Sequence, residues 1–533
     1  MGKSWSNEEE IIMNITRRSA VGMLGAVGAL PLLRSQAQQE VDVQIASGPF
    51  QAAGDSLQAY KTPDWFRNAK FGIWSHWGPQ SVPEKGDWYA RNMYIEGSAQ
   101  YKSHLETYGH PSKFGFKDII PTFKAENFDP DYLVRLYRKA GARYFFSMGV
   151  HCDNFDMWNS RHHRWNAVNM GPKKDIVGLF RDAARSQGLK FGVSEHVWGS
   201  WNWWGVNKGA DKVGPYAGVP YDGNDPANWD LYHEPHAIVD AAWAESGNEP
   251  VSWKREWLKR VMDLVDQHQP DILYEDGGIP FGEWGRSLVA HYYNQSLRWH
   301  KGEMNVVYTA KVASQCAVGT CVLDVERGVF DGLSTNPFQT DTCVGDWHYS
   351  KGIEYKTPKR VIDLLVDVVS RNGNMLLNFP LRPDGTLDDR EMKIVEEITA
   401  WMAVNSEGIY DTRPWKIYGS GPSTLPKGSN DSLGWGKWGG FNEFNRTDLT
   451  ADDVRFTSKG STLFAFVMGW PQPSVLLKPL AIGSPQAPGN VRYVELLGNR
   501  GKLSWKQDES GLRIDLPREK PCDHAITLKV TLA

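Results

Sequence analysis

Acidic and histidine side chains stand at the ends of several short apolar runs in this sequence. The run from Ile272 to Tyr274 is followed by Glu275 and Asp276, and then by two glycines. Carboxylates and imidazoles often serve as nucleophile, acid or base, so these run ends are candidates for a catalytic site. A single histidine is more often structural, but histidines at three ends and acids at two favour an active site. The other run ends carry His76, then His151 with Cys152 and Asp153, then Glu195 with His196.

The two adjacent acids point to opposite sides if the run is a strand. Side chains alternate along a strand, so Tyr274 and Asp276 share one face, while Leu273 and Glu275 share the other. Periodicity alone does not tell which face points into a site. Both acids therefore stay open on this ground.

Strand and helix patterns alternate from about Thr62 to Glu407. Amphipathic stretches lie between several of the apolar runs, and two of them end in glycine, which suits a helix C-cap. Repetition of strand and helix predicts a parallel sheet closed as a (β/α)8 barrel, with the active site at the carboxyl ends of the strands. A doubly wound sheet is the alternative, but no Gly-rich dinucleotide fingerprint follows the first strand. The predicted strands are FGIWSH, RYFFSMGVH, KFGVSEH, DILYED, NVVYTA and NMLLNF.

The composition of the chain changes after about Tyr410. Gly, Ser, Pro and Asn become common, and short alternating runs such as STLFAFVMGW and AITLKVTLA appear. These patterns are typical of antiparallel strands joined by turns. The sequence therefore predicts a catalytic barrel over residues 55–409 and a small C-terminal β-sandwich over residues 410–533.

The N-terminal segment has the features of a targeting signal. Arg17 and Arg18 precede a short apolar stretch from Ala20 to Leu33, and small residues lie near Ala37. The apolar stretch is too short to span a bilayer comfortably, so we interpret residues 1–37 as a cleaved twin-arginine-type export signal. A retained anchor is the alternative. The export reading predicts a periplasmic or extracellular protein without a membrane span in its mature form.

The overall composition limits partners and cofactors. With 533 residues and a net charge of -4, the chain gives no reason to expect a nucleic acid or an anionic membrane as partner. No HExxH-type spacing predicts a metal site, and no cofactor is expected. Cys316 and Cys321 are close enough for a loop disulfide, which the sequence leaves open. The 24 Trp suit either stacking on sugar faces or packing as loop anchors. The same two readings apply to Trp198, Trp201, Trp203 and Trp204.

Motifs spread over most of the barrel resemble those of glycoside hydrolase family 29, the α-L-fucosidases. The matching segments are AKFGIWSHWGPQSVP, DWYARNMY, GVHCDNFDMWNS, PKKDIVGLFRDAARSQGLKFGV, VSRNGNMLLNFPLRPDGTL and NSEGIYDTRPW. The resemblance implies an exported, retaining exo-α-L-fucosidase that needs no metal. Its expected substrate is a fucosylated oligosaccharide or glycoconjugate. The sequence leaves a homo-oligomer possible.

The resemblance also assigns the nucleophile. The family places this Asp in an LWFDG motif, and LYEDG stands in its place here, so the match falls on Asp276, with Tyr274 replacing a Trp. Glu275 is then expected to point away, as part of the barrel wall. A retaining glycosidase needs a second group that protonates the leaving oxygen and later activates water.

The second carboxylate is harder to assign, because Gln339 stands where the family has its acid/base Glu. An amide cannot donate and recover a proton. In LDVERG, Glu326 follows an apolar run, and a subgroup of the family has an acid in this neighbourhood. We therefore predict Glu326 as the acid/base, with Asp341 as the second choice. A structural ion pair with Arg327 or another base is the alternative role for Glu326.

Further pocket residues follow from the matching motifs. Asp87 and Trp88 match an EW pair, Cys152 replaces a second His of the family, and Glu195 and His196 lie where the family has YYS. Lys311 is expected to contact the sugar or the nucleophile, with a solvated lysine as the alternative. The predicted substrate-binding residues are His76, Trp77, Asp87, Trp88, His151, Cys152, Glu195, His196, Tyr274 and Lys311.

Two other functions stay open. The departures at Cys152 and at Glu195 with His196 favour a different exo-glycosidase specificity, such as α-L-galactosidase. The amide at Gln339 favours a non-catalytic fucose-binding protein.

Overall fold

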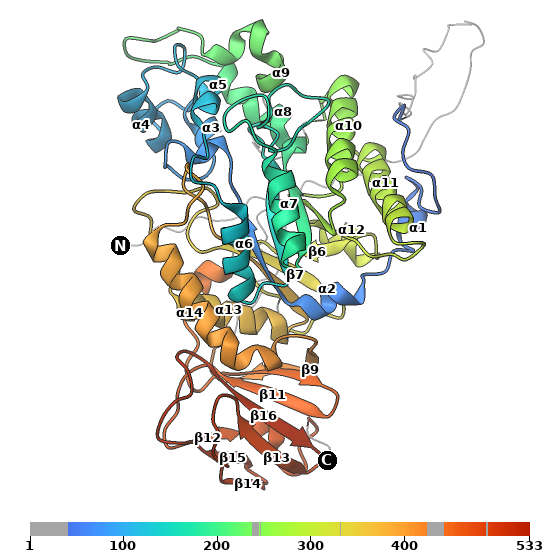
Figure 1. The fold of residues 1–533 in the computed structure, drawn as a ribbon, viewed down its shortest axis with the longest axis vertical. Helices are drawn as coiled ribbons and strands as arrows, with labels where there is room; N and C mark the ends of the chain where they lie inside the picture. Colours follow the sequence, from blue (N-terminus) through green and yellow to red (C-terminus); the bar gives the residue numbers. More distant parts are fainter. Residues whose placement is uncertain (1–40, 237–244, 246, 331, 424–441, 487–488) are drawn as a thin grey trace, which may run out of the picture. The chain divides into compact units, whose positions relative to one another are not determined.

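Eight parallel strands close into a barrel in the computed structural model of the protein, and each strand pairs with its sequence neighbour (Figure 1). β8 returns to pair with β1, with Phe71 opposite Met375. The structure describes residues 41–236, 245, 247–330, 332–423, 442–486 and 489–533; the predicted export signal lies outside them. The strands are β1 Phe71–Ser75, β2 Tyr144–Val150, β3 Lys190–Glu195, β4 Ile272–Glu275, β5 Val307–Ala310, β6 Val322–Asp324, β7 Phe338–Cys343 and β8 Gly373–Asn378.

Helices connect the strands and cover the outside of the barrel. Polar side chains fix several helix starts: Asp129, Asp175 and Thr357 each accept a hydrogen bond from a backbone N–H of the first turn. The helices are α1 Gly54–Leu57, α2 Asp64–Ala69, α3 Tyr89–Asn92, α4 Ala99–Thr107, α5 Phe116–Ile119, α6 Pro130–Lys139, α7 Ile176–Ser186, α8 Ser200–Trp203, α9 Trp229–Tyr232, α10 Val251–His268, α11 Glu283–Trp299, α12 Ala313–Ala317, α13 Pro358–Ser370 and α14 Asp389–Asn405.

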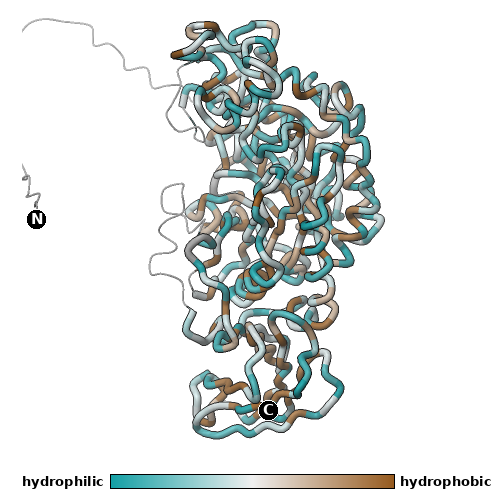
Figure 2. The backbone as a smooth tube through the Cα atoms, turned by 90° about the vertical axis from the view of Figure 1, so that its left-hand side faces the viewer, coloured by the Kyte–Doolittle hydropathy of each residue, from teal (hydrophilic) through white to brown (hydrophobic). Residues whose placement is uncertain are grey.

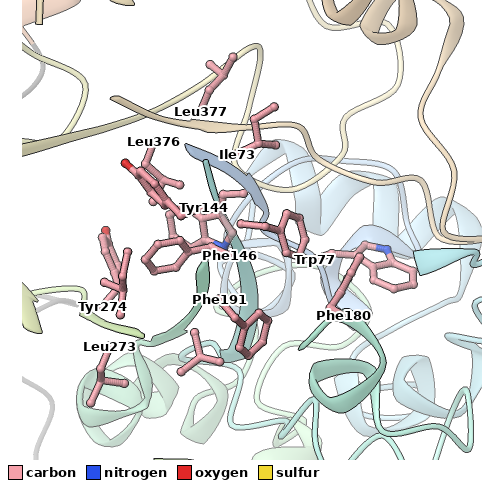
Figure 3. Close-up of a cluster of buried hydrophobic side chains, with 14 of the residues drawn as sticks. Ile73, Trp77, Tyr144, Phe146, Phe180, Phe191, Leu273, Tyr274, Leu376 and Leu377 are labelled. Carbon is pink, nitrogen blue, oxygen red and sulfur yellow. The ribbon is translucent and has the colours of Figure 1, made fainter. Parts of the chain in front are cut away.

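The barrel core is rich in aromatic side chains. Tyr144 and Phe146 of β2 and Tyr274 of β4 lie in one buried cluster (Figure 3). Every residue of β1, β2, β4 and β7 is buried. The first three are largely apolar runs rather than alternating ones, as expected of strands covered on both faces, whereas β7 is mostly polar. Along the rest of the chain, hydrophobic and hydrophilic segments alternate at short intervals (Figure 2).

The C-terminal strands form two antiparallel sheets. The larger has the order β13-β16-β11-β10-β9 and the smaller the order β12-β15-β14. The strands are β9 Arg413–Ser420, β10 Val454–Lys459, β11 Thr462–Val467, β12 Ser474–Leu477, β13 Val491–Leu496, β14 Trp505–Asp508, β15 Gly511–Asp515 and β16 Ile526–Leu532. The predicted barrel with a C-terminal β-sandwich is therefore confirmed, and the doubly wound alternative is wrong.

Strand β11 contributes side chains to two hydrophobic cores. Phe464 and Phe466 belong to the large hydrophobic cluster of the barrel. Leu463, Ala465 and Val467 belong to the separate core between the two C-terminal sheets. Because side chains alternate along a strand, one strand joins both cores. Residues 41–533 form one compact unit.

Two further features bear on earlier expectations. Cys316 and Cys321 form a disulfide, which the sequence left open. Among the residues that the structure describes, no helix has both the length and the apolar character needed to cross a membrane.

Candidate active site

A cavity of about 280 Å3 opens at the carboxyl ends of the barrel strands. This is near the lower end of the usual range for ligand pockets, about 300–1,000 Å3, so it suits one sugar unit. Nine of its lining residues were predicted from the sequence as catalytic or substrate-binding. The lining residues are Trp74, His76, Asp87, Trp88, His151, His196, Tyr274, Asp276, Glu326, Arg327, Asp341 and Trp347.

Asp276 follows β4 directly and is held on several sides. His196 Nδ1 lies 3.0 Å from its Oδ2, and the Tyr274 hydroxyl donates to its Oδ1 at 3.1 Å. The Trp198 indole N–H donates to its backbone carbonyl at 2.9 Å. The next residue, Gly277, has φ +152°, and a Cβ there would lie 2.6 Å from the Trp198 ring, so glycine is needed at this turn. Trp198 thus anchors the loop of Asp276 and does not line the cavity.

Lys311, at the end of β5, contacts four carboxyl groups. Its Nζ lies 3.5 Å from Asp276 Oδ1 and 3.1 Å from Glu326 Oε2. It also lies 3.1 Å from Asp324 Oδ1 and from Asp341 Oδ2. Burial lowers the pKa of Lys311, but the four acids outweigh that effect and hold its pKa well above the ordinary value. Lys311 is therefore a charged partner of the acid cluster and not a solvated lysine.

The same surroundings shift the pKa values of Asp276 and Glu326 in opposite directions. Burial would raise the pKa of Asp276, but the charges of Lys311 and His196 outweigh it and keep that pKa below its ordinary value. Burial raises the pKa of Glu326 to about 8, against the charge of Lys311 and with the help of Asp341 and Asp276. Near neutral pH Asp276 is then ionised, while Glu326 is largely protonated. This is the division of states that acid-assisted displacement needs.

Asp341, the second choice for the acid/base, lies deeper. It is a β7 residue with a side chain only 1% exposed, whereas the side chain of Glu326 is 16% exposed. Its carboxylate accepts the Tyr274 hydroxyl at 2.8 Å and contacts Lys311. Asp341 therefore has its acceptors occupied, and Glu326 is the more accessible of the two.

Two histidines, His76 and His151, line another wall of the cavity, and His348 is buried next to them. The rings of His76 and His151 lie 5.2 Å apart, and His348 lies 4.5 Å from His76. Burial lowers the pKa of each of these three, that of His348 to about 3, so they are neutral near pH 7. A neutral imidazole offers one N–H donor and one acceptor nitrogen. Together with Asp87, which contacts His348 Nδ1 at 2.5 Å, they suit the hydroxyls of a sugar.

Aromatic rings face the cavity as well. Trp74 lies 5.1 Å from Tyr274 and 5.5 Å from Trp347, measured between ring centroids. Such faces cover apolar parts of a sugar, including a methyl group on the ring. The cavity thus combines polar histidines with an apolar indole surface.

Four predicted substrate-binding residues lie outside the lining of the cavity. Lys311 is one of them, although it contacts the carboxyl groups there. For the other three, Trp77, Cys152 and Glu195, the expectation of a sugar contact is corrected. Trp77 is buried, its ring lies next to those of Phe123 and Phe128, and its indole N–H donates to the backbone carbonyl of Arg382. Cys152 is buried, and its Sγ contacts the carbonyl of His196. Each of the three therefore supports the wall behind the cavity.

Glu195 and Glu275 lie on the face of the sheet that points away from the cavity. They are register partners on β3 and β4, so they share one side of the sheet. Glu195 accepts the Trp257 indole N–H from α10 at 2.9 Å, and Glu275 accepts the Tyr308 hydroxyl at 3.3 Å. Glu275 thus points away from the cavity, as expected.

Gln339 also lies inside the barrel and not at the cavity. Its amide donates to Asp324 at 2.8 Å, and its oxygen accepts the Tyr144 hydroxyl at 3.3 Å. An amide here therefore does not remove a proton donor from the cavity.

Sequence reasoning missed Trp74, Asp324, Arg327 and Trp347 with His348. Strand alternation could have found the first two, because Trp74 shares a face with His76, and Asp324 shares one with Glu326. Trp347 and His348 lie in a loop after β7, where no periodicity applies.

Among the residues that the structure describes, two sets of side chains could hold a metal ion. The ligand atoms of His76, His151 and His196 lie within 4.8 Å of one another, as do those of His76, Asp87 and His348. His151 Nδ1 already contacts the Gln80 amide. The expectation of a metal-free enzyme stays a prediction.

Comparison with known proteins gives consistent matches along the chain. The family model described as Alpha-L-fucosidase matches residues 37–407, and that of the Alpha-L-fucosidase C-terminal domain matches residues 446–531. Human plasma alpha-L-fucosidase is 25% identical over 511 residues, covering 90% of this chain and 92% of the relative. Human tissue alpha-L-fucosidase is 26% identical over 491 residues, covering 89% and 90%.

Solved structures share the fold. The Thermotoga maritima alpha-fucosidase in complex with fucose superposes with a TM-score of 0.68 at 24% identity, covering 90% of this chain and all of that one. An alpha-L-fucosidase from Paenibacillus thiaminolyticus, isoenzyme 1, has a TM-score of 0.61 at 20% identity and covers 88% of this chain.

Proposed function

The chain belongs to glycoside hydrolase family 29, the α-L-fucosidases, and on this premise we propose that it is a retaining exo-enzyme with Asp276 as nucleophile and Glu326 as acid/base. Membership makes it a fucose-releasing glycosidase. The main observation behind the proposed mechanism is that two carboxyl groups in contact with the same lysine differ in their protonation state. Asp276 is held ionised and Glu326 is held protonated, and both contact Lys311.

The proposed reaction has two steps. Asp276 attacks the anomeric carbon while Glu326 protonates the glycosidic oxygen, which leaves with the aglycone. The product of this step is a covalent glycosyl-enzyme with inverted configuration. Glu326, now ionised, then takes a proton from water, and the water displaces Asp276 from the sugar. Two inversions release fucose with its original configuration. Contact of both carboxyls with one ammonium supports a close spacing, and retaining enzymes have about 5–5.5 Å between them.

The cavity favours fucose over the alternatives considered from the sequence. The case for α-L-galactosidase used Cys152 and the Glu195 with His196 pair; of these only His196 lines the cavity, where its Nδ1 contacts Asp276 and so serves the nucleophile. The case for a non-catalytic protein used Gln339, which is bound inside the barrel. Neither observation therefore supports its alternative.

Azide rescue of two variants tests the assigned roles. In Glu326→Ala, the glycosyl-enzyme accumulates on an activated aryl fucoside, and azide should restore turnover from the face of the departed aglycone, giving α-fucosyl azide. In Asp276→Gly, azide should replace the nucleophile and give β-fucosyl azide. The proposal fails if Asp341→Ala, and not Glu326→Ala, yields the α-azide. Asp87→Asn is the control, because loss of a sugar contact should not be rescued by azide.

We also propose that the protein is exported, because Arg17 and Arg18 belong to the predicted twin-arginine-type signal. The Cys316–Cys321 disulfide supports an oxidising compartment. Replacing both arginines with lysine should keep the full-length precursor in the cytoplasm, as measured by cell fractionation and mass. Export of that variant at the normal rate would contradict the assignment.

A further inference from the structure

The loop that carries Glu326 is bound by a short segment from the C-terminal part of the chain. This segment is the 3-10 turn η8, Asn442–Asn445. The backbone N–H of Glu443 donates to the carbonyl of Arg327 at 3.0 Å. The Asn442 side chain accepts the N–H of Val329 at 3.0 Å and donates to its carbonyl at 2.8 Å. Residues 327 to 329 are therefore paired through their main chain with Asn442 and Glu443.

The side chain of Glu443 adds a buried ion pair. Its carboxylate is 3% exposed and contacts Arg327 Nε at 2.5 Å and Lys356 Nζ at 3.1 Å. The Thr342 hydroxyl donates to its other oxygen at 2.8 Å. Burial raises the pKa of Glu443, but Lys356 and Arg327 outweigh it, so the pKa stays below its ordinary value. Glu443 is thus a charged anchor between the turn and β7.

The conformation at Arg327 needs such an anchor. Its φ is +47°, a left-handed value that side chains other than glycine rarely adopt without help. Its N–H donates to the carbonyl of Asp341 at 2.7 Å. Arg327 also lines the cavity beside Glu326. A shift of this residue would therefore move the proposed proton donor.

We propose that Asn442 and Glu443 are positioning residues that hold the loop of Glu326 in its working place in the cavity. The inference rests on the proposed function of Glu326. Both residues lie between the two ranges that match the family models, residues 37–407 and 446–531. The connection between β9 and β10 of the C-terminal sheet thus supplies part of the support of the active site.

The test separates proton donation from general stability by the leaving group. A poor leaving group such as phenol needs the acid, whereas 2,4-dinitrophenol does not. In Glu443→Gln, kcat/KM for phenyl α-L-fucoside should fall about tenfold or more, because small displacements of catalytic groups are costly. For the dinitrophenyl fucoside it should change less than about threefold. Glu443→Asp, which keeps the charge, should recover part of the loss.

The pH profile gives a second readout. Without the carboxylate of Glu443, the positive charge of the Arg327 guanidinium acts more strongly on Glu326 and favours its ionised form. The alkaline limb of kcat/KM for the phenyl fucoside should therefore move to lower pH in Glu443→Gln. A loss that is equal for both substrates, with an unmoved alkaline limb, would overturn the proposal.

Two further variants separate an effect on the loop of Glu326 from an effect on folding. Asp363→Asn removes a carboxyl that accepts the N–H of Leu449 at 3.1 Å, and so loosens the same part of the chain without contact to the loop. It should affect both substrates alike. If Glu443→Gln does not fold, Asn442→Ala should show the same leaving-group dependence.

Failure of this inference and failure of the proposed function give different results. If Glu326→Ala shows no leaving-group dependence, the acid/base assignment is wrong. If Glu326→Ala shows it and both Glu443→Gln and Asn442→Ala do not, only the positioning role is wrong.

Discussion

At the scale of single residues, Glu326 sets the upper pH limit of activity. Its pKa is raised to about 8, and the protonated form is the one that donates to the leaving oxygen. We expect kcat/KM for phenyl fucoside to fall above about pH 8, since that quantity reports the free enzyme. With the same phenyl fucoside, Glu326→Gln should be slower and should lack this limb. A limb that persists in that variant would assign the titration to another group.

Lys311 sets the lower pH limit of activity, because its charge lowers the pKa of Asp276. In Lys311→Met the ammonium is lost, and the pKa of Asp276 should rise by about 1–3 units, because an opposite charge within 4–6 Å lowers a carboxyl pKa by that much. The acid limb of kcat/KM should move to higher pH by a similar amount. Lys311→Arg keeps the charge and should leave the limb close to the wild type. An unmoved limb in Lys311→Met would show that Asp276 does not depend on this cation.

The sequence predicted the residues that stand at strand ends, and for a physical reason. Asp276 and His196 follow their strands, where the chain must leave the sheet at the carboxyl face. Glu195, one position earlier, is still in the strand and faces α10, because side chains alternate. No pattern in a single sequence tells which face is outer, and that is why Glu195 was misplaced.

At the scale of elements, two barrel strands escaped prediction. β6 has only three residues, Val322–Asp324, too short for a periodic signal. β7 reads FQTDTC, and its Thr340 and Thr342 are buried by bonding to the carbonyl of Gly328 and to Glu443. Buried polar strands are stable only through such partners, which lie elsewhere in the chain. The other six strands are apolar runs and were predicted.

Helix α13 carries a buried charge that joins it to the C-terminal domain. Asp367 contacts Arg371 of the same helix, Arg446, and Arg455 of β10. In Asp367→Asn these guanidinium groups lose their shared partner, and we expect unfolding free energy to fall by about 3–5 kcal/mol in urea titrations. Asp411→Asn, which removes an exposed pair with Lys459, should cost less than about 1 kcal/mol. Equal effects of the two variants would contradict the view that burial makes this charge important.

The same contact gives a pH dependence of stability. Burial raises the pKa of Asp367, but the three arginines outweigh it and hold the pKa well below its ordinary value. The contribution is therefore present above the unfolded pKa, about 3.9, and is lost as pH falls towards the folded value. Asp367→Asn should show less of this acid destabilisation than the wild type.

At the scale of the whole molecule, the barrel depends on the C-terminal strands. Phe464 and Phe466 of β11 belong to the barrel's hydrophobic cluster, and the Trp401 indole of α14 donates to the carbonyl of Ala525 at 2.7 Å. We expect residues 41–409 alone to be insoluble or to lack a cooperative thermal transition, measured by circular dichroism. A soluble fragment with a sharp transition would show that the barrel closes its own core.

The composition change near Tyr410 predicted the C-terminal strands, but it did not predict that β11 contributes side chains to two cores. Alternation in STLFAFVMGW predicted a strand with one inner and one outer face. The structure gives both faces a core, because β11 lies between the barrel and the second sheet. Only the partners of a strand decide whether its second face meets water.

Of the four carboxyl groups around Lys311, Asp276 and Glu326 line the cavity and are partly exposed to water. A neutral sugar that enters displaces water from these groups, and charges that lose hydration take up protons more readily. Binding of fucose should then draw hydrogen ions from the surrounding medium. The heat measured by titration calorimetry would differ between phosphate and Tris, because these buffers have different enthalpies of ionisation, and the difference would count the ions taken up.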